Sequence, residues 1–169
     1  MDWTGQLHEQ LDWHWRTQLR PRLDGLTDDE YLWQPVADAW TVRPDGTIDW
    51  AWPAPDPAPV TTIAWRLAHV TVPCLGLRAF SHLGGPPVSF DGPYAGTADE
   101  ALSRLDDAYA RWSEGVRGLD AAALERPVGE AEGPWADVPM GGLVLHINRE
   151  LIHHGAELAL LRDLYLRRT

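Results

Sequence analysis

The chain has 169 residues, of which 44% are hydrophobic, and it carries ten tryptophans and a formal net charge of −11. This length and apolar content predict one globular domain over residues 1–169 with a substantial core, rather than a disordered chain. The acidic charge argues against nucleic-acid or anionic-membrane partners, because phosphate contacts need a basic face.

The basic and sulfur-containing side chains further limit the kinds of catalysis and of covalent cross-link that the chain can form. Each of the 14 basic side chains is an arginine, which excludes catalysis through a covalent lysine adduct. The one cysteine, Cys74, leaves no internal disulfide and fits a reducing compartment. The N-terminal residues lack the basic and apolar segments of a signal peptide, and no apolar run reaches bilayer length. These features predict a cytoplasmic protein without a membrane partner.

The first helix is predicted over about residues 4–24, where Leu7, Leu11 and His14 recur on one face. Gly25 follows directly, and a glycine at this position commonly ends a helix.

A short helix and a long loop are expected next. Residues 27–33 begin with a capping threonine and an acidic first turn, which favours a helix. Residues 35–60 are rich in proline, hold Trp40, Trp50 and Trp52, and show no helical period. We predict a long loop that its tryptophans pack down as a lid or flank.

The second main helix is predicted over about residues 61–83, with a threonine cap at its start. It carries apolar residues on most sides, which indicates burial nearly all round. Pro73 is expected to kink it one turn after His69, and the glycines at 84 and 85 end it.

Two further helices complete the predicted fold. Thr97 and Glu100 form a capping box that opens a helix to about residue 119, and the last helix covers about 140–168. The pattern predicts an all-α protein, a four-helix bundle with a long Pro/Trp-rich loop between its first and second main helices.

The last helix concentrates imidazoles and carboxylates. At about 100° per residue, with His146 at zero, Glu150 falls at about 40° and His154 at about 80°, whereas His153 points away at about 340°. An apolar stripe lies between about 60° and 140°, and its members are Leu143, Ile147, Leu151, Leu158 and Leu161. Glu150 and His154 therefore face the core, where a metal ion is one of the few partners that satisfies both.

Bundle cores build metal sites from facing helices, so another helix is expected to complete the pair. His69 is the best candidate, because it lies in the middle of a buried helix, one turn after the bulky Trp65. His14 is the second choice, as a ligand or as a pocket-lining base. His146 is expected to orient Glu150 from one turn away.

Plainer interpretations stay open for each of these residues. A lone core histidine such as His69 is more often satisfied by a hydrogen bond than by a metal, and Glu150 with His154 alone also fits a hydrogen-bonded pair on the helix surface. His153 is predicted to face solvent, and Cys74 to be a small buried hydrophobe.

The start of the second predicted helix also resembles a known family. Residues 62–69 read TIAWRLAH, which is similar to the start of the second helix in the DinB-like superfamily, whose histidine at that place is a metal ligand. Residues 26–33 and 40–43 read LTDDEYLW and WTVR, which is typical of actinobacterial members of the superfamily.

The last helix carries a second resemblance. Many members hold a His-x3-His pair there, whereas residues 149–154 read RELIHH and resemble the Arg-Glu-x3-His pattern of the mycothiol-dependent maleylpyruvate isomerases. Carried over by residue, the resemblance implies a metal triad of His69, Glu150 and His154, the set that the helical positions favour.

The resemblance implies thiol S-transfer or thiol-dependent isomerisation, with mycothiol or bacillithiol as cosubstrate and a small electrophile as the second partner. Three protein ligands leave room for exchangeable ones, as in catalytic zinc sites; zinc and nickel both suit the donors. A coordinated thiol exists as the nucleophilic thiolate.

Two other function classes remain open. One is a metal-dependent hydrolase, with His14 or His146 as the proton shuttle. The other is a non-catalytic, stress-related bundle protein that binds metal for stability. The sequence also leaves homodimerisation through an apolar face open.

Overall fold

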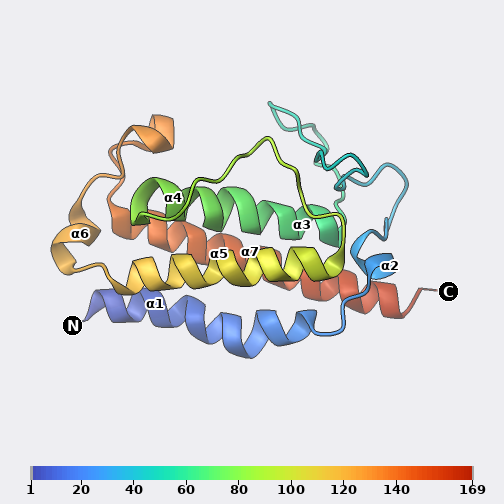
Figure 1. The fold of residues 1–169 in the computed structure, drawn as a ribbon, viewed down its shortest axis with the longest axis horizontal. Helices are drawn as coiled ribbons and strands as arrows, with labels where there is room; N and C mark the ends of the chain where they lie inside the picture. Colours follow the sequence, from blue (N-terminus) through green and yellow to red (C-terminus); the bar gives the residue numbers. More distant parts are fainter. Residues whose placement is uncertain (1, 169) are drawn as a thin grey trace.

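The computed structural model describes residues 2–168 and confirms an all-α fold (Figure 1). The α-helices are α1 (Trp3–His14), α2 (Asp28–Tyr31), α3 (Ile63–His69), α4 (Leu77–Leu83), α5 (Ala98–Arg117), α6 (Ala121–Glu125) and α7 (Met140–Leu166). The π-helical segments are η1 (Trp15–Leu19) and η3 (Val70–Gly76), and the 3₁₀ segments are η2 (Arg20–Leu23) and η4 (Glu130–Trp135). Among residues 2–168, no helix combines the length and apolarity that a bilayer crossing requires.

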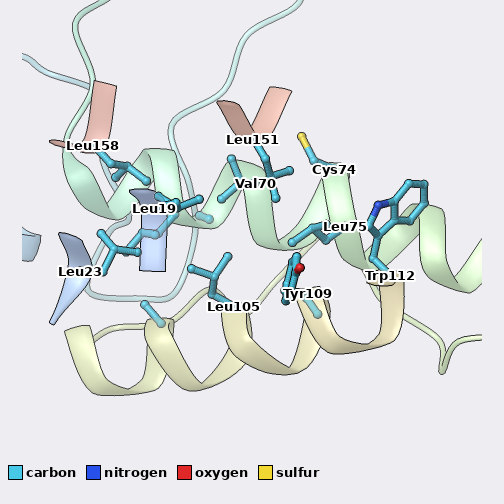
Figure 2. Close-up of a cluster of buried hydrophobic side chains, with 14 of the residues drawn as sticks. Leu19, Leu23, Val70, Cys74, Leu75, Leu105, Tyr109, Trp112, Leu151 and Leu158 are labelled. Carbon is cyan, nitrogen blue, oxygen red and sulfur yellow. The ribbon is translucent and has the colours of Figure 1, made fainter. Parts of the chain in front are cut away.

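The long helices run alongside one another as a bundle (Figure 1). Helix α1 packs on α5 and α7, and the continuous helix formed by α3, η3 and α4 packs on the same two neighbours. The core lies between them (Figure 2), and its fully buried side chains include Leu23, Leu67, Val70, Leu75, Leu105, Trp112, Ile147, Leu151 and Leu158.

Side-chain caps fix where the central helices begin. The hydroxyl of Thr62 accepts a hydrogen bond from the backbone N–H of Trp65 at 3.2 Å, and this cap begins α3. Thr97 caps α5 in the same way, through the N–H of Glu100 at 3.3 Å. In a capping box the Glu100 carboxylate would accept from the N–H of the capping residue Thr97. Here it accepts instead from the N–H of Gly96, one residue earlier, at 3.2 Å. Both predicted helix starts are thus present.

Pro73 lies inside a π-helical turn rather than at a break in the helix. Proline lacks an N–H, and its ring meets the carbonyl four residues earlier, here that of His69. A wider turn accommodates both effects, and the guanidinium of Arg78 donates to the Pro73 carbonyl at 2.6 Å. The predicted helix over 61–83 therefore continues past Pro73. The side chains that follow His69 point in other directions around the helix axis than they would in a regular α-helix.

The long loop packs against the start of α3. Trp40 exchanges two backbone hydrogen bonds of 2.9 Å with Val60 and Thr62. The rings of Trp40 and Trp50 lie 6.1 and 6.3 Å from the Trp65 ring. These contacts agree with a loop that flanks the domain. Trp52, however, is 86% exposed, so it does not anchor the loop as the sequence predicted.

The stretch between the last two predicted helices contains the short helical segments α6 and η4. Glu132 of η4 contacts His82 at 2.8 Å and Arg78 at 3.0 Å. Its side chain is only 8% exposed, so the hydrogen bond with His82 and the ion pair with Arg78 fasten this connection to α4.

Candidate metal centre

The structure brings the three predicted ligands together where α3 meets α7. His69 is the last residue of α3, and Glu150 and His154 lie one turn apart on α7. One carboxylate oxygen of Glu150, Oε2, lies 3.7 Å from Nε2 of His69 and 3.3 Å from Nε2 of His154. One donor atom from each residue lies within 4.8 Å of the other two.

These separations fit a shared cation better than direct hydrogen bonds. A good N–H···O hydrogen bond spans about 2.7–3.2 Å, and both contacts of the Glu150 oxygen are longer. Tetrahedral zinc, with ligand bonds of about 2.0–2.1 Å, separates its nitrogen and oxygen donors by about 3.3 Å. Two imidazole nitrogens and one carboxylate oxygen are donors that zinc and nickel accept. The residues present therefore fit a divalent transition-metal ion.

His154 is held from behind by Glu157. Its Nδ1 lies 2.6 Å from the carboxylate of Glu157, whose same oxygen is 3.1 Å from Nε of Arg66. The guanidinium of Arg66 also reaches Nδ1 of His154, but at 3.3 Å. The shorter contact indicates that Nδ1–H donates to Glu157, which leaves the Nε2 lone pair directed to Glu150. A carboxylate in this position is a common support for a metal-binding histidine.

His69 is oriented mainly by stacking. Its ring lies 5.2 Å from the Trp65 ring at an interplanar angle of 8°, and its Nδ1 is buried with no hydrogen-bond partner in the described chain. The indole N–H of Trp65 donates to the carbonyl of Asp49 at 2.7 Å, and the Trp50 ring stacks near Trp65. Through Trp65, the loop over residues 35–60 therefore forms part of the wall behind His69.

Burial keeps both imidazoles neutral. It lowers the pKa of His69 to about 4; neighbouring His154 lowers it further, and Glu150 partly opposes this. Burial also lowers the pKa of His154, whose hydrogen bond to Glu157 acts the other way. Neutral imidazoles present free lone pairs at neutral pH, as metal ligands must. Burial and the charge of Glu150 raise the pKa of the nearby Cys74 thiol to about 12.

His146 and His14 lie outside the cluster of three. Nδ1 of His146 is 3.7 Å from Glu150, too long for a hydrogen bond, and is instead 2.6 Å from the Arg149 guanidinium. His14 points at the α7 backbone, where a Cβ on Gly155 would lie 3.0 Å from its Nε2. The structure thus places His146 beside Glu150 and His14 in the contact between α1 and α7.

A cavity of about 390 Å³ lies near the cluster, although none of the three ligands lines it. Its walls combine charged and apolar side chains, among them Arg78, Val128, Glu132, Trp135, Leu143, His146 and Arg149. Two of these wall residues, His146 and Arg149, lie 3.7 and 3.9 Å from Glu150. These two side chains therefore connect the cavity to Glu150.

Sequence reasoning missed Arg66 and Glu157. Each lies three residues from a predicted ligand and hence on the same helical face, which is a weak signal because many residues share such spacing. His153 is exposed as predicted and also lies 3.5 Å from Glu157. His153, His154 and Glu157 form a second cluster of donor atoms, in which Glu157 is already paired with Arg66 at 3.1 Å.

A comparison with known protein families identifies the family of this chain. The sequence model of the DinB superfamily matches residues 10–158, which include α3, the part of α7 up to Leu158 and the three residues of the cluster. The chain belongs to the DinB superfamily. No curated protein and no solved structure matches it. Proteins of the DinB superfamily often bind metal, and in this member the donors available at the centre of the bundle are His69, Glu150 and His154.

Proposed function

We propose that the protein is a divalent-metal-dependent enzyme that activates a low-molecular-weight thiol for S-transfer or isomerisation. His69, Glu150 and His154 hold the ion, which is zinc or nickel, and the thiol is of the mycothiol or bacillithiol type. The observation that carries the proposal is the convergence of these three donor atoms within 4.8 Å of one another. A cavity of about 390 Å³ lies nearby and is connected to Glu150 through its wall residues His146 and Arg149.

The residues around the ion have distinct tasks. A bound divalent cation would lower the pKa of a coordinating thiol and so supply the nucleophilic thiolate. Glu157 fixes the ring of His154, and Trp65 fixes the ring of His69. Trp65 is only 6% exposed, so it also keeps water from that side of the cluster.

The cavity supplies the place for the reactants. The Arg149 guanidinium contacts His146 at 2.6 Å, but its side chain is 70% exposed and offers further donors to an anionic group. Arg78, in contrast, is engaged by Glu132 at 3.0 Å. Trp135 and Leu143 offer an apolar wall. This combination suits a small electrophile with both polar and apolar parts.

Metal analysis followed by a thiol titration tests the proposal. We expect about one zinc or nickel per chain after loading, loss of that ion in His154→Ala, and calorimetric binding of mycothiol or bacillithiol only to the metal-loaded protein. The S-methylated thiol serves as the control that cannot form a thiolate. Full metal occupancy in His154→Ala would overturn the ligand set. Turnover of ester or epoxide substrates without any thiol would favour a hydrolase instead.

A further inference from the structure

Cys74 is buried in the core, as the sequence predicted, and its thiol also lies next to His69. Its Sγ is 3.6 Å from Nε2 of His69, the ring atom that also faces Glu150. Figure 2 shows the sulfur pointing away from the core side chains of Leu75 and Trp112. The thiol therefore lies at the edge of the core, on the side of the candidate metal centre.

The π-helical turn brings this thiol to His69. In an α-helix a residue five positions further along is rotated by about 140° and points elsewhere. In a π-helix the hydrogen bonds join residues five apart, so the fifth residue lies about one turn above the first. Cys74 follows His69 by five residues, and both belong to the π-helical turn: His69 directly precedes the segment Val70–Gly76, and Cys74 lies within it. The widened turn around Pro73 thus changes which side chain shares a face with His69.

The sulfur–nitrogen distance matches that of two ligands on one ion. With a zinc–sulfur bond of about 2.3 Å and a zinc–nitrogen bond of about 2.0–2.1 Å, tetrahedral geometry separates the two donors by about 3.6 Å. The observed separation between Cys74 and His69 is 3.6 Å. In the metal-free chain this contact is a hydrogen bond between the thiol and the imidazole, and an ion bound to both atoms would replace it.

We infer that Cys74 is a fourth protein ligand, which completes a set of two nitrogens, one oxygen and one sulfur. The inference rests on the proposed metal centre. The Cys74 thiol is not among the donors that lie within 4.8 Å of one another, so binding of all four residues requires Glu150 and His154 to draw in toward the ion while the Cys74–His69 separation is kept. Binding breaks the S–H bond, forms a sulfur–metal bond and releases the proton to solvent, without any change of oxidation state.

A resident thiolate has a consequence for the reaction. Four protein ligands close a tetrahedral site, whereas catalytic sites keep a position open. An external thiol must therefore either displace Cys74 or enlarge the coordination shell. Cys74 then competes with the cosubstrate thiol for the ion, and in the absence of the cosubstrate it fills the fourth coordination position.

Cobalt substitution tests the inference without measuring activity. Cobalt(II) bound by a thiolate shows a near-ultraviolet sulfur-to-metal charge-transfer absorption, which nitrogen and oxygen donors do not give. We expect this absorption in the wild-type protein in thiol-free buffer and its loss in Cys74→Ala and Cys74→Ser. Cys74 is the one cysteine of the chain, so no other side chain can supply the thiolate. Both variants should still bind one cobalt with the remaining three ligands.

The outcomes separate the two proposals. Cobalt bound by the wild-type protein without a sulfur band overturns the role of Cys74 alone, and X-ray absorption on the same sample gives this answer even where a variant fails to fold. No cobalt binding at all overturns the metal centre and the inference with it. If the Cys74→Ala protein binds cobalt but gains no sulfur band when mycothiol is added, the proposed thiol activation is wrong while the Cys74 assignment stands.

Discussion

Nδ1 of His154 lies 2.6 Å from the carboxylate of Glu157, three residues further along α7. The same carboxylate is 3.1 Å from Arg66 of α3, so a charged chain joins the two helices that carry the ligands. Arg66 forms an ion pair with Glu157, and Glu157 accepts a hydrogen bond from the His154 ring. This fixes the ring so that its Nε2 faces Glu150. The orientation of the imidazole is therefore set by residues that themselves face away from the ion.

Replacing Glu157 is expected to weaken metal binding. Glu157→Ala removes the acceptor of the Nδ1–H group, and loss of such a partner typically lowers metal affinity by about 10–100-fold. Glu157→Gln keeps an acceptor oxygen and should lie between this variant and the wild-type protein. Chelator competition measures the affinity. The control is His153→Ala, whose exposed ring should leave the affinity unchanged; an unchanged affinity in Glu157→Ala contradicts the role given to Glu157.

The indole N–H of Trp65 should contribute measurably to stability. Trp65→Phe keeps an aromatic ring against His69 but loses the 2.7 Å hydrogen bond to the Asp49 carbonyl. We expect a loss of about 0.5–1.5 kcal/mol in the free energy of unfolding for this bond, and about 3–5 kcal/mol for Trp65→Ala, which leaves a cavity. Urea unfolding measures both. Limited proteolysis should show faster cleavage within residues 35–60 in both variants, and equal cleavage rates would mean that Trp65 does not anchor the loop.

A buried ion pair joins α2 to α7. Nε of Arg162 lies 2.7 Å from Glu30, and the side chain of Glu30 is 3% exposed. Glu30→Ala leaves the Arg162 cation buried without its partner, which typically costs about 3–5 kcal/mol. Glu9→Gln is the matched control, because its contact with Arg16 is 3.8 Å long and both side chains are exposed. Equal unfolding midpoints for the two variants would rule out a structural role for the buried pair.

The sequence was sufficient for the all-α fold and for the positions of the long helices. Helix periodicity and capping residues are local, so Thr62 and Thr97 could be assigned as helix starts without any tertiary information. The same periodicity placed Glu150 and His154 on the inner face of α7. His69 could be named because a buried imidazole needs a partner, which is a local argument as well.

What the sequence could not give depends on changes of helical register and on contacts between helices. Helical periodicity assumes about 100° per residue, and η3 departs from this value around Pro73. The burial of Cys74 could therefore be predicted, but its contact with His69 could not. Likewise, the role of Glu157 depends on Arg66, which belongs to another helix. His14 faces the α7 backbone because of how α1 packs, and its position in sequence does not determine this.

The buried histidines should make the metal-free protein less stable in acid. Burial lowers the pKa of His14 below its ordinary value of 6.5, with a backbone contact at Leu151 partly opposing it, and the shifts of His69 and His154 have the same sign. As the pH falls below about 6.5, the unfolded chain takes up protons that the folded chain does not, so the free energy of unfolding decreases. His14→Asn removes one of these groups, and its stability should therefore fall less steeply between pH 7 and pH 5. Urea titrations of the chelator-treated protein across this range measure both slopes. The exposed His153→Asn variant should keep the wild-type slope, and a His14→Asn slope equal to it would show that His14 protonates as readily in the folded chain as in the unfolded one.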